Sequence, residues 1–305
     1  MANCFKALKE QPPDTEEKWD GKSHGYPIGY QILFFFLKTI GLRFTYGFLH
    51  FIAGYFVLFV PGARNTQYKR FREIHGLSKW KAFTATYRTV YNFAISLVDR
   101  AALIGGVKQD FGLISHGREY IDSMIKGGNG GYLMSCHLGN WEIAGHLLDL
   151  KAGKVNVLMY DEEHQKIKQS MPEVQKNRGF NIIPIKNDLG HVFGVQAALG
   201  RGELVALHAD RYKEGGRIFK RDFCGKPAKF PEGPFMLAAK IAAPRVFVQA
   251  IKTGTFTYTY KSSETIEGKI APEELMNKYV DWMEQLLTEY PEQWYNFYDF
   301  WSDGE

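Results

Sequence analysis

The chain has 305 residues, of which 45% are hydrophobic, so it is long enough to bury a full core as one large domain or two. Its formal net charge is only +5, and no recognised nucleic-acid-binding motif accompanies it, which argues against a nucleic acid partner. The cysteines are odd in number and widely spaced, which excludes a disulfide framework and a zinc-binding pattern and suits a reducing compartment. They are Cys4, Cys136 and Cys224.

The N-terminal third is predicted to contain a helix that contacts a membrane. Residues 1–28 are polar and lack the basic start of a secretory signal. Phe44–Val60 then carries no formal charge over seventeen residues, which is short of the roughly 20 that a spanning helix needs. Because basic residues flank it on both sides, we expect a helix that lies in, or dips into, the inner leaflet, with a buried core helix as the alternative. The flanking basic residues are Lys38, Arg43, Arg64, Lys69, Arg70, Arg72, Lys79 and Lys81.

The remaining elements predict an α/β fold. Trp80–Leu103 lacks Gly and Pro and predicts a long packing helix. From Gly131 onward, short apolar runs alternate with helical patterns, so we expect a mixed, mostly parallel central sheet flanked by helices, with an antiparallel edge. The predicted strands are 131–136, 155–160, 180–185, 204–207, 245–251 and 255–260, the last two as a hairpin about Gly254. The predicted helices are 141–150, a polar helix after 160, 191–199, one from about 234, and 272–290.

The carboxyl end of the first of these strands carries a candidate for proton transfer. His137 follows the strand, and Glu142 lies five positions later in the first turns of the next helix. In open α/β sheets this edge is where ligands bind. An imidazole whose second nitrogen is held by a carboxylate is a general base, while the alternative is a histidine and a glutamate with no joint role. Cys136 points to the opposite face from its neighbours and is predicted to be a buried, inert thiol.

A basic segment follows the strand predicted at 204–207. It contains seven basic residues against Glu214 and Asp222 and accounts for the chain's positive surplus. Such a loop beside an active site suits the phosphate groups of a ligand or of an anionic lipid, and a merely solvated charged loop is the alternative. The basic residues are Arg211, Lys213, Arg217, Lys220, Arg221, Lys226 and Lys229.

His137-Leu-Gly-Asn-Trp-Glu142 resembles the H-x4-[DE] signature of the lysophospholipid acyltransferase superfamily, and most closely its branch of late lipid A (Kdo-dependent) biosynthesis acyltransferases. Further segments resemble this branch in the same order, so that the resemblance covers roughly residues 30–300. They are 203–211, 223–238, Ala243-Pro244 and 291–294. The resemblance implies a membrane-associating region at 1–105 and a catalytic α/β acyltransferase domain at 106–305.

The activity implied by the resemblance is transfer of a fatty acyl chain from an acyl carrier protein or CoA thioester to a lipid acceptor. The acceptor is a hydroxyl or amine of a lipid A-like molecule or of another bacterial glycolipid or aminolipid, at the cytoplasmic face of the inner membrane. His137, oriented by Glu142, would deprotonate the acceptor without an acyl-enzyme, and the backbone N–H groups of Gly139 and Asn140 would hold the oxyanion. The implied substrate-binding residues are Gly139, Asn140, Asp210, Arg211 and Lys213. No cofactor or bound metal is expected.

The sequence also departs from the lipid A enzymes. Tyr160-Asp161 stands where many of them carry an arginine, and the C-terminal segment 293–301 is aromatic and mildly acidic instead of basic. The acceptor is therefore open. Two other functions stay as alternatives: a metal-dependent lipid hydrolase that uses His137, Glu142 and His146, with Asp210 as a distant ligand, and a non-catalytic lipid-binding protein of the same fold.

Overall fold

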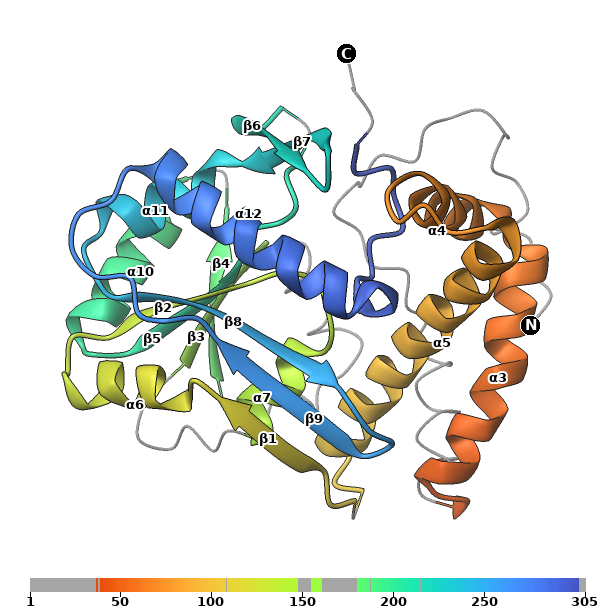
Figure 1. Ribbon diagram of the computed structural model, residues 1–305. Coiled ribbons are helices and arrows are strands. Elements are labelled where there is room, and N and C mark those ends of the chain that lie inside the picture. Colours follow the sequence, from red (N-terminus) through yellow and green to blue (C-terminus); the bar gives the residue numbers. More distant parts are fainter. Residues whose placement is uncertain are drawn as a thin grey trace.

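The computed structural model describes residues 37, 39–107, 109–147, 155–160, 180–186, 188–213 and 215–301. The polar N-terminal segment and the polar helix expected after residue 160 lie outside these residues. A central sheet of seven strands forms the middle layer, with helices on both faces and three N-terminal helices beside it (Figure 1). This confirms the predicted α/β class.

The strand order is β1-β9-β8-β2-β5-β3-β4. From β8 to β4 the neighbours pair in parallel, β9 runs antiparallel to β8, and β1 pairs in parallel with β9. The mostly parallel sheet and its antiparallel edge are thus confirmed, including the hairpin about Gly254. The strands are β1 (Gly112–His116), β2 (Gly131–Ser135), β3 (Val155–Tyr160), β4 (Phe180–Ile185), β5 (Leu204–His208), β8 (Arg245–Lys252) and β9 (Thr257–Ser262).

Helices cover both faces of the sheet, and its central strands are buried. α10 (Gly190–Gly200), α11 (Glu232–Lys240) and α12 (Pro272–Glu289) cover one face, and α6 (Arg118–Lys126) and α7 (Trp141–Leu147) lie on the other (Figure 1). Alternate residues of β2 point to opposite faces of the sheet. Tyr132 and Met134 pack in the core under α10, α11 and α12, and Leu133 packs in the core under α6 and α7. β2 is therefore buried throughout and is fixed in the centre of the molecule.

The N-terminal helices form a separate group against one end of the sheet. They are α3 (Leu42–Phe59), α4 (Pro61–Glu73) and α5 (Lys79–Ile104), and α3 packs along α5. α3 is long and apolar enough to cross a membrane by length and composition, yet one side of it is buried against the protein. Its other side exposes Phe44, Phe51 and Phe59. The helix predicted at 44–60 is confirmed, and α4 is an element that the sequence pattern did not indicate.

The predicted basic loop is wrong in part, because residues 218–231 form a β-hairpin of β6 (Ile218–Phe223) and β7 (Lys226–Pro231). Cys224 and Gly225 form its two-residue turn with φ of 53° and 79°. Such a turn favours Asn-Gly or Asp-Gly. Because a cysteine stands in the first position here, the sequence pattern did not predict a hairpin. Phe223 and Phe230 are fully buried in the hairpin and anchor it to the core.

A buried ion pair ties the N-terminal helices to the sheet. Asp99 of α5 lies 2.6 Å from the ammonium of Lys252 at the end of β8, and it accepts hydrogen bonds from the Tyr46 and Tyr258 hydroxyls. The side chains of Asp99 and Lys252 are 0% and 14% exposed. Burial raises the pKa of Asp99 and lowers the pKa of Lys252, so each charge depends on the other.

Asp99→Ala is expected to lower the free energy of unfolding by about 3–5 kcal/mol, because it leaves the Lys252 charge buried without its partner. Lys278→Ala is the control, since it breaks an ion pair to Glu274 whose side chains are 52% and 59% exposed. That change should cost at most about 1 kcal/mol. Urea unfolding followed by circular dichroism measures both values. Equal losses would show that Asp99 is not a structural anchor.

Candidate active site

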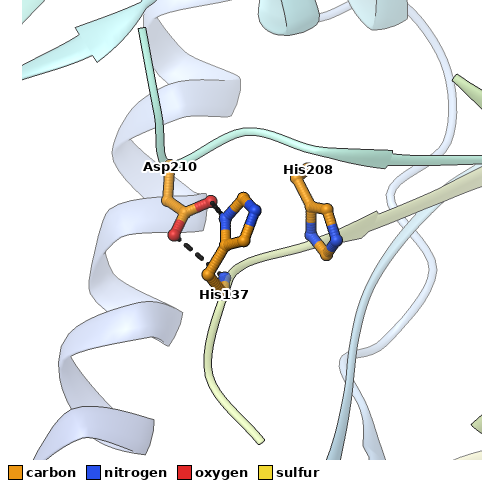
Figure 2. A group of neighbouring side chains, drawn as sticks. All are labelled: His137, His208 and Asp210. Carbon is orange, nitrogen blue, oxygen red and sulfur yellow. Dashed lines mark hydrogen bonds and ion pairs between the residues drawn. The ribbon is translucent and has the colours of Figure 1, made fainter. Parts of the chain in front are cut away.

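His137 and Asp210 meet at the carboxyl ends of two neighbouring parallel strands. β2 pairs with β5 in a register that places Ser135 opposite His208, so residues two positions further on also lie side by side. His137 Nδ1 is 2.8 Å from Asp210 Oδ1, and the His137 backbone N–H donates to Oδ2 at 2.9 Å (Figure 2). Both carboxylate oxygens of Asp210 are thus committed to His137.

The charges of this pair suit proton transfer. Asp210 is buried, which by itself raises its pKa, but the charge and hydrogen bond of His137, together with Arg211, bring the pKa of this carboxyl well below its usual range. Asp210 is therefore an anion at neutral pH, and it holds Nδ1 of His137 in the protonated form. Nε2 is left as the nitrogen that accepts a proton, on a side chain that is 26% exposed.

Glu142 is not the partner of His137, and this prediction is wrong in its geometry. The Glu142 carboxylate lies 3.0 Å from Arg100 of α5. α7 begins at Trp141, and its first turn faces α5, so the carboxylate is directed at the guanidinium there. The ion pair is half-buried and holds α7 against α5. The sequence missed Asp210 as the orienting group because it lies 73 positions from His137 along the chain.

The loop between His137 and α7 is held by backbone contacts that use the N–H groups expected to bind an oxyanion. Gly139 N–H donates to the carbonyl of Gln293, and Asn140 N–H donates to the carbonyl of Ala250, both at 2.8 Å. That prediction is therefore wrong. Gly139 has a φ of +67°, and a Cβ there would lie 2.0 Å from the Ala250 carbonyl oxygen, so only glycine fits.

The Asn140 side chain holds the same loop from its other side. Its amide donates to the backbone carbonyl of Ser96 in α5 at 2.9 Å. Asn140, one of the residues expected to bind substrate, thus connects the start of α7 to α5.

Arg211 and Lys213 lie on the chain that leaves Asp210. Arg211 donates to the carbonyl of Tyr295 at 2.8 Å, and its guanidinium lies over the Tyr298 ring, so contacts within the protein hold this side chain. Lys213 has its ammonium 5.7 Å from the centre of the Tyr160 ring. Further along, three of the basic residues are in ion pairs, namely Arg217 with Glu232, Arg221 with Asp281 and Lys226 with Glu73. Phosphate binding by Lys213 stays a prediction.

An apolar cavity opens beside these residues, between the sheet and α7. It is open to the surroundings at one side, and most of its lining is apolar. Ser135 and Trp141 line it close to the dyad, and Phe180 and Tyr260 line it further along the sheet. The other lining residues are Leu133, Glu142, Gly145, Val155, Val157, Ala206, Val248, Gln249 and Ala250.

His137, His208 and Asp210 each offer a ligand atom within 4.8 Å of the others, which raises the question of a metal ion. The arrangement fits a metal poorly, because both Asp210 oxygens accept hydrogen bonds from His137 and Nδ1 of that ring carries the proton. The ligand set of the metal-dependent hydrolase alternative is not supported either, since Glu142 pairs with Arg100. The side chain of His146 lies outside the described residues.

The fold and site define an α/β protein with a histidine–aspartate dyad at its strand ends, beside an apolar cavity. Residues 93–302 match the family "Bacterial lipid A biosynthesis acyltransferase", and the chain belongs to this family, as the sequence resemblance predicted. It is also similar to "Phosphatidylinositol mannoside acyltransferase" from two strains of Mycobacterium tuberculosis, H37Rv and CDC 1551, at 27% identity over 130 residues. That similarity covers 42% of this chain and 40% of each relative.

Asp210→Asn is expected to lower the rate of acyl transfer by about 10²–10⁴-fold, because the Asn amide favours the wrong tautomer of His137. Glu142→Gln is the matched control: it weakens the Arg100 ion pair and should lower the melting temperature while keeping the rate within about 10-fold of the wild type. Thiol release from palmitoyl-CoA measures the rate. A larger loss in the Glu142 variant, with its fold intact, would restore Glu142 as the orienting residue.

Proposed function

We propose that this protein is a membrane-associated acyltransferase that moves a fatty acyl chain from a thioester to a hydroxyl or amine of a lipid acceptor. The observation that carries the proposal is the His137–Asp210 dyad beside the apolar cavity. Membership of the lipid A biosynthesis acyltransferase family supports the same reaction. The dyad supplies a base, the cavity supplies a site for an apolar chain, and the family membership indicates lipid chemistry. Acyl transfer to a lipid uses all three.

In the proposed mechanism His137 Nε2 removes the proton of the acceptor O–H or N–H as that atom attacks the thioester carbon. The C–S bond breaks as the new C–O or C–N bond forms, and the departing thiolate takes the proton back from His137. Asp210 stabilises the imidazolium between the two steps and does not itself change its protonation state. A positioned base of this kind contributes about 10²–10⁴ in rate.

The apolar cavity is the proposed binding site for the acyl chain of the donor. Most of its lining is apolar, with Ser135, Glu142, Gln249 and Tyr260 as the polar residues, so a chain that enters it buries methylene groups at about 0.8 kcal/mol each. Ser135 and Trp141 lie at the dyad end, which supports a binding mode with the reacting carbonyl close to His137. We propose acyl carrier protein or acyl-CoA as the donor, with Lys213 near the phosphates and no cofactor.

The acceptor is proposed to be a lipid A-like molecule or another bacterial glycolipid or aminolipid. The name of the mycobacterial relatives supports a glycosylated lipid. The aromatic, mildly acidic segment 293–301 supports an acceptor with an amine or a neutral headgroup more than a phosphorylated one.

Membrane association at the cytoplasmic face of the inner membrane is proposed through α3. One side of this helix packs on the protein through Leu42, Tyr46, Leu49, Ala53 and Val57, and the other side presents aromatic rings to the surroundings. This two-sided pattern supports a helix that lies in the interface, because a spanning helix would have to leave its packing partners.

His137→Ala is expected to abolish acyl transfer while the protein stays folded, because it removes the base. Lipid mass spectrometry of cells that express either protein should show one lipid class that gains an acyl chain with the wild type alone. Preincubation of the purified enzyme with EDTA should leave product formation unchanged. Equal lipid profiles with both proteins would contradict the proposal, and loss of activity with EDTA would favour the metal-dependent alternative.

Replacing Phe51 and Phe59 together by Asn should weaken binding to phosphatidylethanolamine–phosphatidylglycerol vesicles by at least about 10-fold, because each side chain offers a largely exposed ring to the lipid. Leu189 and Phe193 are the matched control, since they are 67% and 66% exposed on another part of the molecule. Their double Asn variant should bind as the wild type does. Vesicle co-sedimentation measures both, and equal binding by the two double variants would place the membrane contact elsewhere.

A further inference from the structure

His208 lies at the active site and has no role in the proton transfer described above. It is the last residue of β5, and its ring lies 4.3 Å from the ring of His137, centre to centre (Figure 2). Trp141 contacts it edge to face at 5.2 Å, and Ser135 Oγ lies 2.9 Å from its Nδ1. Three neighbours thus fix the position of this ring beside the base.

The contact between Ser135 Oγ and His208 Nδ1 bears on which ring nitrogen of His208 carries the proton. The Ser135 hydroxyl has two acceptors within reach, His208 Nδ1 at 2.9 Å and the Leu207 carbonyl at 3.4 Å, and the shorter contact is favoured. Nδ1 then accepts, and the proton of the neutral ring is on Nε2. Among the contacts of the described residues, none uses Nε2 of His208 as donor or acceptor.

His208 is a neutral imidazole at physiological pH. Burial, and then the nearby charge of His137, lower the pKa of His208 to about 3. It therefore does not compete with His137 for the proton of the acceptor. A neutral imidazole can still polarise a carbonyl group by donating a hydrogen bond from its N–H.

The proposed reaction requires a donor at this place. As the acceptor attacks, the thioester carbonyl oxygen becomes an oxyanion, and a fixed donor stabilises it more than it stabilises the starting carbonyl. The backbone N–H groups of Gly139 and Asn140 are already used. Ser135 and Trp141, which contact His208, also line the apolar cavity, so the ring of His208 lies beside the end of the cavity at which the carbonyl of a bound acyl chain could approach it.

We propose that the Nε2–H group of His208 donates a hydrogen bond to the thioester carbonyl oxygen and stabilises the oxyanion during acyl transfer. The inference rests on the proposed acyltransferase function. His137 takes the proton of the acceptor, the oxyanion forms on His208, and its collapse expels the thiolate, which recovers the proton from His137. His208 is thus a catalytic residue that keeps its own proton throughout.

Two substitutions separate the two nitrogens of the ring. His208→Asn places an amide oxygen near the position of Nδ1 and can keep the Ser135 hydrogen bond, but it has nothing at Nε2. His208→Gln places an amide N–H near the position of Nε2. We expect the Asn variant to lose about 10²–10³-fold in kcat with little change in KM for palmitoyl-CoA, and the Gln variant to stay within about 10-fold of the wild type. Melting temperatures show whether both variants fold.

A spectroscopic measurement detects the hydrogen bond itself. Palmitoyl-CoA with 13C at the thioester carbonyl is bound to the His137→Ala protein, which cannot turn it over, with and without His208→Asn. Isotope-edited infrared spectra should show a carbonyl stretch lowered by the protein when His208 is present, and a return toward the solution frequency in the Asn variant. The same frequency in both proteins would overturn the proposal, even where the Asn variant is slow.

The outcomes distinguish this inference from the function on which it rests. Full activity of His208→Asn in a protein whose transfer depends on His137 would overturn the role of His208 alone. Absence of transfer by the wild type, with no difference from His137→Ala, would instead overturn the proposed function. A slow Gln variant whose bound carbonyl also returns to the solution frequency would support the proposal, because that side chain then fails to reach the oxygen.

Discussion

The hydrogen bond between His137 and Asp210 depends on the parallel pairing of β2 with β5. The two residues follow their strands at matching positions, so the register of the sheet sets the distance between them. A slip of one residue would turn the core side chains of β2 to the wrong face, where Tyr132 and Leu133 would exchange cores. Because β2 is buried and paired on both sides, the packing of the core keeps the base and its carboxylate together.

The loop after β2 takes its shape from the C-terminal segment. The Gln293 amide binds both backbone groups of Lys252, at 3.0 and 2.8 Å, while its own carbonyl accepts from Gly139. Tyr295 N–H donates to the His137 carbonyl at 3.0 Å. These contacts provide hydrogen-bond partners for backbone groups at the ends of β2 and β8, where strand pairing stops. Because the N–H group of Gly139 is used in this way, it is not available to an oxyanion. A side chain, proposed above to be His208, would then be the donor.

The sequence predicts those parts of the molecule that depend on local pattern. The strands at 155–160 and 180–185 are found with the expected bounds, because apolar runs between polar segments mark buried parallel strands. β1 gave no such signal, since it is an edge strand with most of its residues exposed. His137 was predicted as the base from the residues around it. Its partner was not, because spacing along the chain cannot show that β2 and β5 are neighbours.

A continuous series of polar contacts joins the proposed lipid-facing helix to the active site. Tyr46 of α3 bonds to Asp99, which holds the ammonium of Lys252. The backbone of Lys252 binds Gln293, whose carbonyl holds Gly139 in the loop after His137. Each of these residues is buried or half-buried, so the helix and the dyad are connected through the interior of the protein.

This connection has a consequence for the proposed choice of acceptor. When α3 rests in the lipid interface as proposed, the position of His137 relative to the bilayer is fixed by the same contacts. An acceptor group must then reach the dyad from the membrane without help from a moving domain. The distance by which a headgroup hydroxyl or amine extends from the bilayer therefore becomes part of what the enzyme selects, alongside the fit of the headgroup itself.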